Sequence, residues 1–321
     1  MRTQTKIWLC IAVSLLLIGG VIFGGAMMKL NWDFTKLSTT QFVTNTYEIT
    51  DAYKDIFVII DTANLTFVPS KDGICKVVCY EEQNAQHKVA VQDGTLIVQA
   101  ENEKKWYEHI GIHFDTPMVT VYMPQGAYGA LNVNFATGSV EIPQTFTFDN
   151  IKAQGSTGYV TNLASATGDI KIWTSTGAIR VENVNACSLD LAVSTGKVTV
   201  SDVTCTGDVA VSVSTGKTAL TNVKCAGVAS DGNTGDISMK NVVAQNAVSI
   251  VRTTGDVTFD GCDAAEIAVT TDTGDVKGSL LTDKVFIAQS DTGRIRVPET
   301  TNGGKCKITT DTGDIDIHVA K

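Results

Sequence analysis

Features that would assign a function quickly are scarce in this sequence of 321 residues. Proline occurs only 5 times, aromatic residues make up 7% of the chain, and no long helical pattern follows the first 30 residues. The net charge is −9, and the lysines and arginines form no basic stripe. Because contacts to phosphates need clustered cations, the sequence predicts that nucleic acid is not a partner.

Motifs for catalysis and for metal binding are also missing. The four histidines, His87, His109, His113 and His318, lie near no Ser or Cys in a nucleophile motif. The nonapeptide glycine signature of calcium-binding β-rolls does not occur either. The sequence therefore predicts no catalytic residue and no cofactor.

The chain does have an internal repeat, marked by the dipeptide Thr-Gly. A fixed period of this kind is typical of stacked repeats, in which each unit needs its neighbours to bury an apolar face. We expect each glycine to take a positive φ at a structural turn, a conformation that a residue with a Cβ reaches only at a cost. The repeated glycines stand 19 or 20 residues apart, at Gly138, Gly158, Gly177, Gly196, Gly216, Gly235, Gly255, Gly274, Gly293 and Gly313.

Apolar residues alternate after each glycine, as in Val257-Thr-Phe259, and again half a unit later, as in Ile267-Ala-Val269. Alternation with period two predicts short, half-buried strands, two in each unit. The sequence thus predicts an all-β fold, a parallel β-solenoid of about nine coils. An antiparallel meander or sandwich is the alternative, because further Thr-Gly pairs lie near half-period. In a solenoid, the residues two positions after the glycines should form one buried column, including Ile237, Val257, Val276, Ile295 and Ile315.

The N-terminal segment has a different composition. Residues 1–6 form a short basic tail, and residues 7–28 are 22 positions without a charge. A helix of that length is ~33 Å long and crosses a bilayer core of about 30 Å. The basic tail predicts that the N-terminus is cytoplasmic and that the rest of the chain is outside. The alternative to this retained span is a cleaved signal peptide, for which Gly24 and Ala26 offer small residues.

The remaining chain divides into three predicted parts. Residues 29–46 are polar and predict a tether, residues 47–135 predict an irregular β section that caps the stack, and residues 136–321 hold the Thr-Gly solenoid. Within the cap, Asp93-Gly94 indicates a hairpin, and the charged stretch 101–109 indicates an exposed loop. We predict that the last half-coil, at the C-terminus, is either an exposed edge of the stack or an edge that another element covers.

The cysteines allow two interpretations. Seven of the eight lie beyond the apolar segment, and an odd number argues against a complete disulfide framework. Cys205 and Cys225 share one offset in consecutive units, so stacking would bring their Cα atoms to ~4.8 Å, within the range of a disulfide. The alternative is a ladder of small buried side chains, because Ala244 and Ala264 occupy the same offset.

Carboxylates also repeat in the last units. Stacked carboxylates repel one another unless they are hydrated, paired or bridged by a cation. We interpret them as a solvated acidic edge and predict no specific metal. The weak candidates for a cation ladder are Asp272, Asp275, Asp291, Asp311 and Asp314.

Several stretches together resemble the putative-adhesin family of β-strand-repeat domains, which occurs in bacterial cell-envelope proteins. They are Asn64–Pro69, Val91–Val98, Val119–Pro124 and the Thr-Gly-Asp ladder from Gly138 onward. The resemblance covers residues 45–319. It implies a single-pass, extracytoplasmic β-solenoid anchored in a bacterial plasma membrane, and it supplies no catalytic residue.

Two functions follow as hypotheses. The first is a non-enzymatic envelope protein, a β rod for adhesion, scaffolding or stress sensing that binds a protein or a glycan. The second is a carbohydrate-active solenoid enzyme acting on cell-wall or extracellular polysaccharide. Paired carboxylates and exposed aromatic residues in a groove would distinguish the enzyme. Aromatic residues are few in the repeats, Trp173 and Phe259 among them, which favours the first hypothesis.

Overall fold

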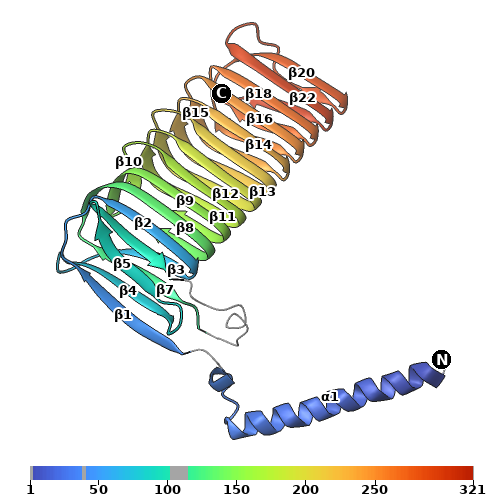
Figure 1. Cartoon of the computed structure of the whole chain (residues 1–321). Coiled ribbons are helices and arrows are strands. Elements are labelled where there is room, and N and C mark those ends of the chain that lie inside the picture. The colour runs from blue at the N-terminus through green and yellow to red at the C-terminus, as the bar shows by residue number, and fades with distance from the viewer. Residues whose placement is uncertain (1–2, 38–40, 102–114, 321) are drawn as a thin grey trace.

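The computed structural model describes residues 3–37, 41–101 and 115–320. It is a rod of stacked β coils with one long helix at its N-terminal end (Figure 1). Strand pairing within the repeats is parallel throughout, and the rod has about ten turns where the repeat predicted nine. The predicted solenoid is therefore confirmed. Apart from its first residue, the predicted loop at 101–109 lies outside the described residues.

The first element, α1, spans Thr3–Lys29 and is followed by a short 3-10 helix, Phe34–Leu37. Mean hydropathy within Gln4–Lys29 reaches 2.5, and none of the most apolar 18-residue window is buried. Met27, near the end of the helix, is 0% exposed. In water, a helix that is apolar on every side leaves its apolar surface exposed, which is unfavourable. Its length and composition suit a membrane span, and a signal sequence has the same properties.

Seven strands precede the repeats. They are β1 (Phe42–Ile49), β2 (Asp55–Thr62), β3 (Asn64–Pro69), β4 (Cys75–Glu82), β5 (His87–Gln92), β6 (Thr95–Ala100) and β7 (Met118–Met123). β1 begins inside the range expected for the tether, because it pairs antiparallel with β4 along its whole length. β2 and β3 together follow the path of one coil, and β6 and β7 stack on them in parallel.

Antiparallel pairing closes this end of the stack. β5 pairs with β6, and β4 pairs with β7. The β5–β6 hairpin turns at Asp93 and Gly94, whose φ values of 49° and 73° suit a two-residue type I′ turn. Gln92 pairs with Thr95 across that turn, which confirms the predicted hairpin.

The repeats form the rod proper. Their strands are β8 (Gly126–Ile142), β9 (Phe146–Asn162), β10 (Ser165–Ala166), β11 (Ile170–Ala186), β12 (Leu189–Cys205), β13 (Val209–Cys225), β14 (Val228–Thr234), β15 (Ile237–Ala244), β16 (Ala247–Thr254), β17 (Val257–Cys262), β18 (Glu266–Thr273), β19 (Val276–Leu280), β20 (Lys284–Thr292), β21 (Ile295–Arg296), β22 (Gly304–Thr312) and β23 (Ile315–Val319). Val257 pairs with Ile237 on one side and with Val276 on the other. All three are 0% exposed, so the residues at this offset form one column of the core.

The Thr-Gly turns stack directly on one another. Eight of the ten repeat glycines have φ between 127° and 152°, where only glycine is unstrained. A Cβ on Gly196 would also lie 1.7 Å from the carbonyl oxygen of Gly177 in the next coil. The expected positive φ is not found at Gly274 and Gly293. There the close approach alone requires glycine, since a Cβ would lie 2.0 Å from the neighbouring carbonyl oxygen.

A second corner of each coil has a positive φ without glycine. Asn183, Asp202, Asn222 and Asn241 lie six residues after a repeat glycine and have φ of 51–56°. Asn and Asp tolerate this conformation better than other residues with a Cβ. Their side chains stack as well, because the Asn222 amide donates to Asp202 at 2.8 Å and the Asn241 amide donates to Asn222 at 2.9 Å.

The coils at the C-terminal end do not stack in the order of the sequence. β22 pairs with both β18 and β20, so the last coil of the chain lies between two earlier ones. Val276 therefore contacts Ile315, and Ile295 lies in the outermost coil. The prediction that Ile295 is buried is wrong, since it is 44% exposed with a neighbouring coil on one side only. The last half-coil is covered, and β20 and β21 form the edge instead.

Candidate functional site

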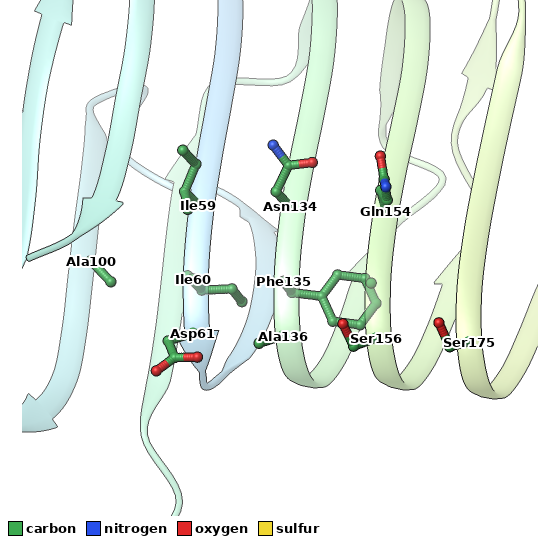
Figure 2. A pocket seen from close by; sticks show the side chains of 11 residues that line it. Ile59, Ile60, Asp61, Ala100, Asn134, Phe135, Ala136, Gln154, Ser156 and Ser175 are labelled. Carbon is green, nitrogen blue, oxygen red and sulfur yellow. The ribbon is translucent and has the colours of Figure 1, made fainter. Parts of the chain in front are cut away.

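A groove runs along the rod beside the Thr-Gly turns, from β2 to β13. It consists of two adjoining hollows of about 590 Å³ and 230 Å³, which share Gln154, Gly155 and Ser175. Figure 2 shows the larger hollow, with lining residues from several successive strands. The groove is therefore a property of the stack and not of a single loop.

Strand alternation places its side chains. Residues two and four positions before each repeat glycine point outward, while the residue between them points into the core. The position two before the glycine is small in consecutive coils, as in Ser156, Ser175 and Ser194. Longer side chains stand four before it, as in Asn134 and Gln154. Small residues beside longer ones leave a polar trough.

The floor of the larger hollow is apolar. Ile60 and Phe135, from adjacent coils, point into the core behind the hollow, and only 2% and 4% of their surfaces are exposed (Figure 2). The Phe135 ring occupies the space over Gly155, where a Cβ would lie 2.0 Å from the ring. Gly155 thus makes room for Phe135. The groove combines a hydrophobic floor with hydroxyl and amide groups, as ligand sites commonly do.

Trp173 stands at the wall of the smaller hollow. The Lys152 ammonium lies 5.4 Å from the centre of the indole ring, a cation–π distance. Trp173 pairs with Ala192 in the next coil. Because the Ala192 side chain is small, space remains beside the indole and forms the smaller hollow. An indole with an open side is a suitable platform for an apolar face of a ligand.

Among the described residues that line the two hollows, Asp61 is the single carboxylate. Most glycosidases need two carboxyl groups, one as general acid and one as nucleophile or base. The described lining of the groove thus has binding groups of several kinds and one carboxylate in place of that pair.

The acidic residues predicted to stack do so, and protein groups satisfy them. Asp256 accepts a hydrogen bond from the backbone N–H of Asp275 at 2.8 Å, and Asp275 accepts one from Asp314 at 2.7 Å. Lys277 pairs with Asp275 at 2.5 Å, and Arg294 pairs with Asp314 at 2.9 Å. The hydrogen bond from Lys277 lowers the pKa of Asp275, and the backbone and side-chain hydrogen bonds from Arg294 lower the pKa of Asp314.

The other weak metal candidates, Asp272, Asp291 and Asp311, are exposed on the rod. In the described part of the chain, the acidic ladder holds no group of three residues close enough to share a metal ion. One such group does occur elsewhere in the described ranges, and it lies in the cap. Sequence reasoning missed it because its members are not joined by a motif.

The cysteines of the repeats are small buried side chains. Cys205 and Cys225 are 5% and 3% exposed, and both thiols are free. They stand in one column with Ala186 and Ala244, which are also buried. Burial raises the pKa of Cys205 to about 12 and that of Cys225 to about 11. These thiols therefore stay protonated and belong to the core.

Arg252 is a charged residue whose buried position the sequence did not predict. It points into the core and is 1% exposed. Its guanidinium donates to the carbonyl oxygen of Val213 at 2.8 Å and to the Thr218 hydroxyl at 3.1 Å. Gly232 in the adjacent coil makes room for it, since a Cβ there would lie 1.8 Å from Nη1. Arg252 fills the core in the way that Phe135 does beside Gly155.

The chain belongs to the Toastrack DUF4097 family. The family profile matches residues 53–214 and 206–321, which together include the cap from β2 onward and all of the repeats. The match confirms the resemblance to the putative-adhesin family of β-repeat domains. No curated protein matches the chain.

Solved structures with a similar fold come from several bacteria. One is a putative adhesin from Bacteroides fragilis, with 19% identity, 87% of this chain and 97% of that chain covered, and a TM-score of 0.33. Another is a putative lipid binding protein from Parabacteroides distasonis, with 13% identity, 86% and 97% covered, and a TM-score of 0.40. A third is a putative cell adhesion protein from Clostridium sporogenes, with 9% identity, 88% and 100% covered, and a TM-score of 0.27. These similarities are too distant to transfer a function.

Proposed function

We propose that this protein is a non-enzymatic, membrane-anchored adhesin-like rod that binds an extended polar polymer, a glycan, in the groove between β2 and β13. The observation that carries the proposal is the groove itself, which repeats similar hydroxyl and amide groups from coil to coil. A polymer of similar units could meet similar groups at successive coils, which stand ~4.8 Å apart.

The chemistry of the lining supports a glycan in particular. Sugar hydroxyls can exchange hydrogen bonds with Asn134, Gln154 and the serines of the trough. The apolar face of a sugar ring can pack on the Trp173 indole. Because Asp61 is the one carboxylate among the lining residues that the structure describes, we favour binding over hydrolysis. The alternative function, a polysaccharide-cleaving enzyme, would need a second carboxylate at the groove.

The proposed site can be tested with the full chain in detergent micelles. Calorimetry with a panel of soluble neutral and acidic polysaccharides should detect binding that Trp173→Ala weakens by at least about 10-fold, the effect of losing about 1.4 kcal/mol of stacking. Tyr159→Ala is the matched control, because Tyr159 is an aromatic residue, 65% exposed, on the other side of its Thr-Gly turn. Equal affinity of the two variants would contradict binding in this groove.

The proposed topology places α1 in the plasma membrane of a bacterium, with the N-terminus in the cytoplasm and the rod outside. The basic residues before the apolar run that starts at residue 7, and the apolar surface of α1, support this orientation. Protease added to intact cells should degrade the rod and leave a small fragment in the membrane. Full protection of the chain, or a mature N-terminus near Lys29, would contradict the anchored topology.

A further inference from the structure

The cap contains a buried cluster of three side chains with different chemistry. Cys79 and Glu81 point inward from β4, two residues apart on one face, and His87 begins β5. The Cys79 thiol, one Glu81 carboxylate oxygen and one His87 ring nitrogen all lie within 4.8 Å of one another. The three residues are 0%, 1% and 7% exposed. In the described ranges, this is the one group of three such side chains that could share a metal ion.

Neighbouring groups hold Glu81 and His87 in place. Glu81 Oε2 accepts a hydrogen bond from the backbone N–H of His87 at 2.7 Å and lies 2.5 Å from His87 Nδ1. Glu81 Oε1 accepts a hydrogen bond from the Asn45 amide at 2.6 Å. The Tyr47 hydroxyl donates to the His87 carbonyl oxygen at 2.9 Å. Such support from surrounding groups is typical of residues that bind a metal.

One polar atom of the cluster has no partner. His87 Nε2 is buried and makes no hydrogen bond within the described part of the chain. A buried ring nitrogen without a partner is costly and needs an explanation. In the described part of the chain it is one of four buried side-chain polar atoms without a partner, and the one that belongs to this cluster. If Nδ1 donates its proton to Glu81, the unpartnered Nε2 carries a lone pair.

A role for Cys79 as a nucleophile does not fit this environment. Burial, and secondly the charge of Glu81, raise the pKa of Cys79 to about 12, so that the free thiol stays protonated. Reactive cysteines have lowered pKa values and partial exposure. A bound cation would reverse the balance by stabilising the thiolate, which binds it as a ligand.

We propose that Cys79, Glu81 and His87 bind a divalent transition-metal ion, best fitted by Zn²⁺. Thiolate, imidazole and carboxylate are the ligand types of zinc, whereas Ca²⁺ and Mg²⁺ take oxygen ligands. On binding, the Cys79 S–H bond breaks, its proton leaves to solvent, and a sulfur–metal bond forms. Glu81 and His87 exchange their short contact for bonds to the same ion. His87 binds as a neutral imidazole, and the proton of that contact ends on the ring nitrogen that does not bind the ion.

The ion would act as a structural staple. β4 pairs with β1 and β7, and β5 pairs with β6, so the register places no ladder of hydrogen bonds between β4 and β5 themselves. A metal held by residues of both strands joins them at the end of the rod nearest α1. Three protein ligands leave a fourth position, which water can take.

The test uses the full chain without a polyhistidine tag, in detergent micelles, first freed of metal with a chelator. With one equivalent of Co²⁺ added under reducing conditions, the absorption spectrum should show a thiolate-to-cobalt charge-transfer band. Zn²⁺ should then displace the Co²⁺ and raise the melting temperature. Cys79→Ser should remove the charge-transfer band, and His87→Gln should weaken binding by at least about 100-fold.

Cys75→Ser is the matched control. Cys75 is buried on the same face of β4, but it accepts a hydrogen bond from the Tyr53 hydroxyl at 3.1 Å and lies outside the cluster. Its replacement should leave the cobalt spectrum unchanged. Asn45→Ala, which removes the donor to Glu81, should weaken binding by about 10- to 100-fold.

X-ray absorption at the zinc edge of the unmutated chain provides a result that does not depend on the folding of variants. One sulfur and two or three nitrogen or oxygen ligands are expected. A zinc site with no sulfur or with two or more would overturn the proposal. So would a charge-transfer band that survives Cys79→Ser, or the absence of any shift in melting temperature with one equivalent of Zn²⁺.

Discussion

The two ends of the rod differ in how the terminal coil of the stack is covered. A stack of β coils leaves an apolar face and an unpaired strand at each end, and either one invites association with other chains. At the N-terminal end, antiparallel strands β4 and β5 close the stack, and Val77 on β4 is 0% exposed. At the C-terminal end, β20 and β21 have a neighbour on one side only (Figure 1).

The exposed fractions of equivalent side chains show that the C-terminal end is open. Ile315 and Ile295 occupy the same offset in adjacent coils, yet Ile315 is 0% exposed and Ile295 is 44% exposed. On the edge strand β20, the core-facing Phe286 and Ala288 are only partly buried, whereas their partners Cys306 and Ile308 in the adjacent coil are 1% exposed. Closure thus depends on the antiparallel strands of the cap and not on the repeat itself. The repeat is the same near both ends.

The ends share one feature, which is a change in the order of the coils. β2 and β3 lie between the coil of β6 and β7 and the later β8. In the same way, β22 lies between β18 and the earlier β20. At each end the chain runs out to the terminal coil and returns to fill an inner position. The strands next to each end are therefore paired on both sides.

The largest effect should come from a side chain at a stacked glycine. Gly255→Val in the interior should cost roughly 4 kcal/mol of unfolding free energy, because φ is 149° and a Cβ would lie 2.2 Å from the Gly235 carbonyl oxygen. Gly293→Val should cost less, since the outermost coil can detach locally. Chemical denaturation measures both, with the exposed Asp256→Asn as a control within about 0.5 kcal/mol. Equal costs at Gly255 and Gly293 would mean that the C-terminal end is not open.

Substitutions that remove a core side chain should distinguish the inner coil from the outermost coil. Ile315→Ala deletes a fully buried side chain and should cost about 3 kcal/mol. Ile295→Ala should cost less than about 1 kcal/mol, because nearly half of that side chain is already exposed. Both are measured by urea denaturation of the same preparation. A larger cost for Ile295→Ala than for Ile315→Ala would mean that the coils stack in the order of the sequence, with the last coil outermost.

Hydrogen exchange provides a smaller but direct test of strand order. Amides of β22 should exchange at least about 10-fold more slowly than those of β20, because β22 is paired on both sides and opening it also requires the outer coil to open. Mass spectrometry of peptides covering 284–292 and 304–312 makes the comparison. Faster exchange in 304–312 would contradict the inserted coil.

The smallest effect concerns acid. The pKa values of Asp275 and Asp314 lie below the ordinary value of 3.8, so their stabilisation is complete above pH 3.8 and is lost as the pH falls through the lower folded values. These residues and Arg294 join the last three coils, so the open end should loosen first. Melting curves between pH 5 and 2.5 should fall less steeply for Asp275→Asn than for Asp272→Asn. Identical curves would show that the ladder does not contribute.

Much of the fold could be predicted because it depends on residues that recur at a fixed, short spacing in the sequence. The spacing of the glycines identified the coils, and Asp93-Gly94 identified a hairpin, since both depend on conformations that few residues adopt. The second corner at Asn183 and its equivalents was equally regular, but Asn and Asp are common in every kind of turn and gave no distinct signal. The buried cluster could not be found this way, because His87 and Cys79 stand on different strands.

By itself the sequence determined what repeats: an alternation of period two, a glycine at each turn, and an apolar segment long enough to span a membrane. Each of these depends on neighbours within one coil or one helix, where residue type and local conformation are tightly coupled. The tertiary structure alone decided which coil ends the rod, which isoleucine is buried, and which side chains meet in the cap and the groove. Every coil offers nearly the same surface to its neighbours, so the order of the coils depends on how the ends close and not on any single repeat.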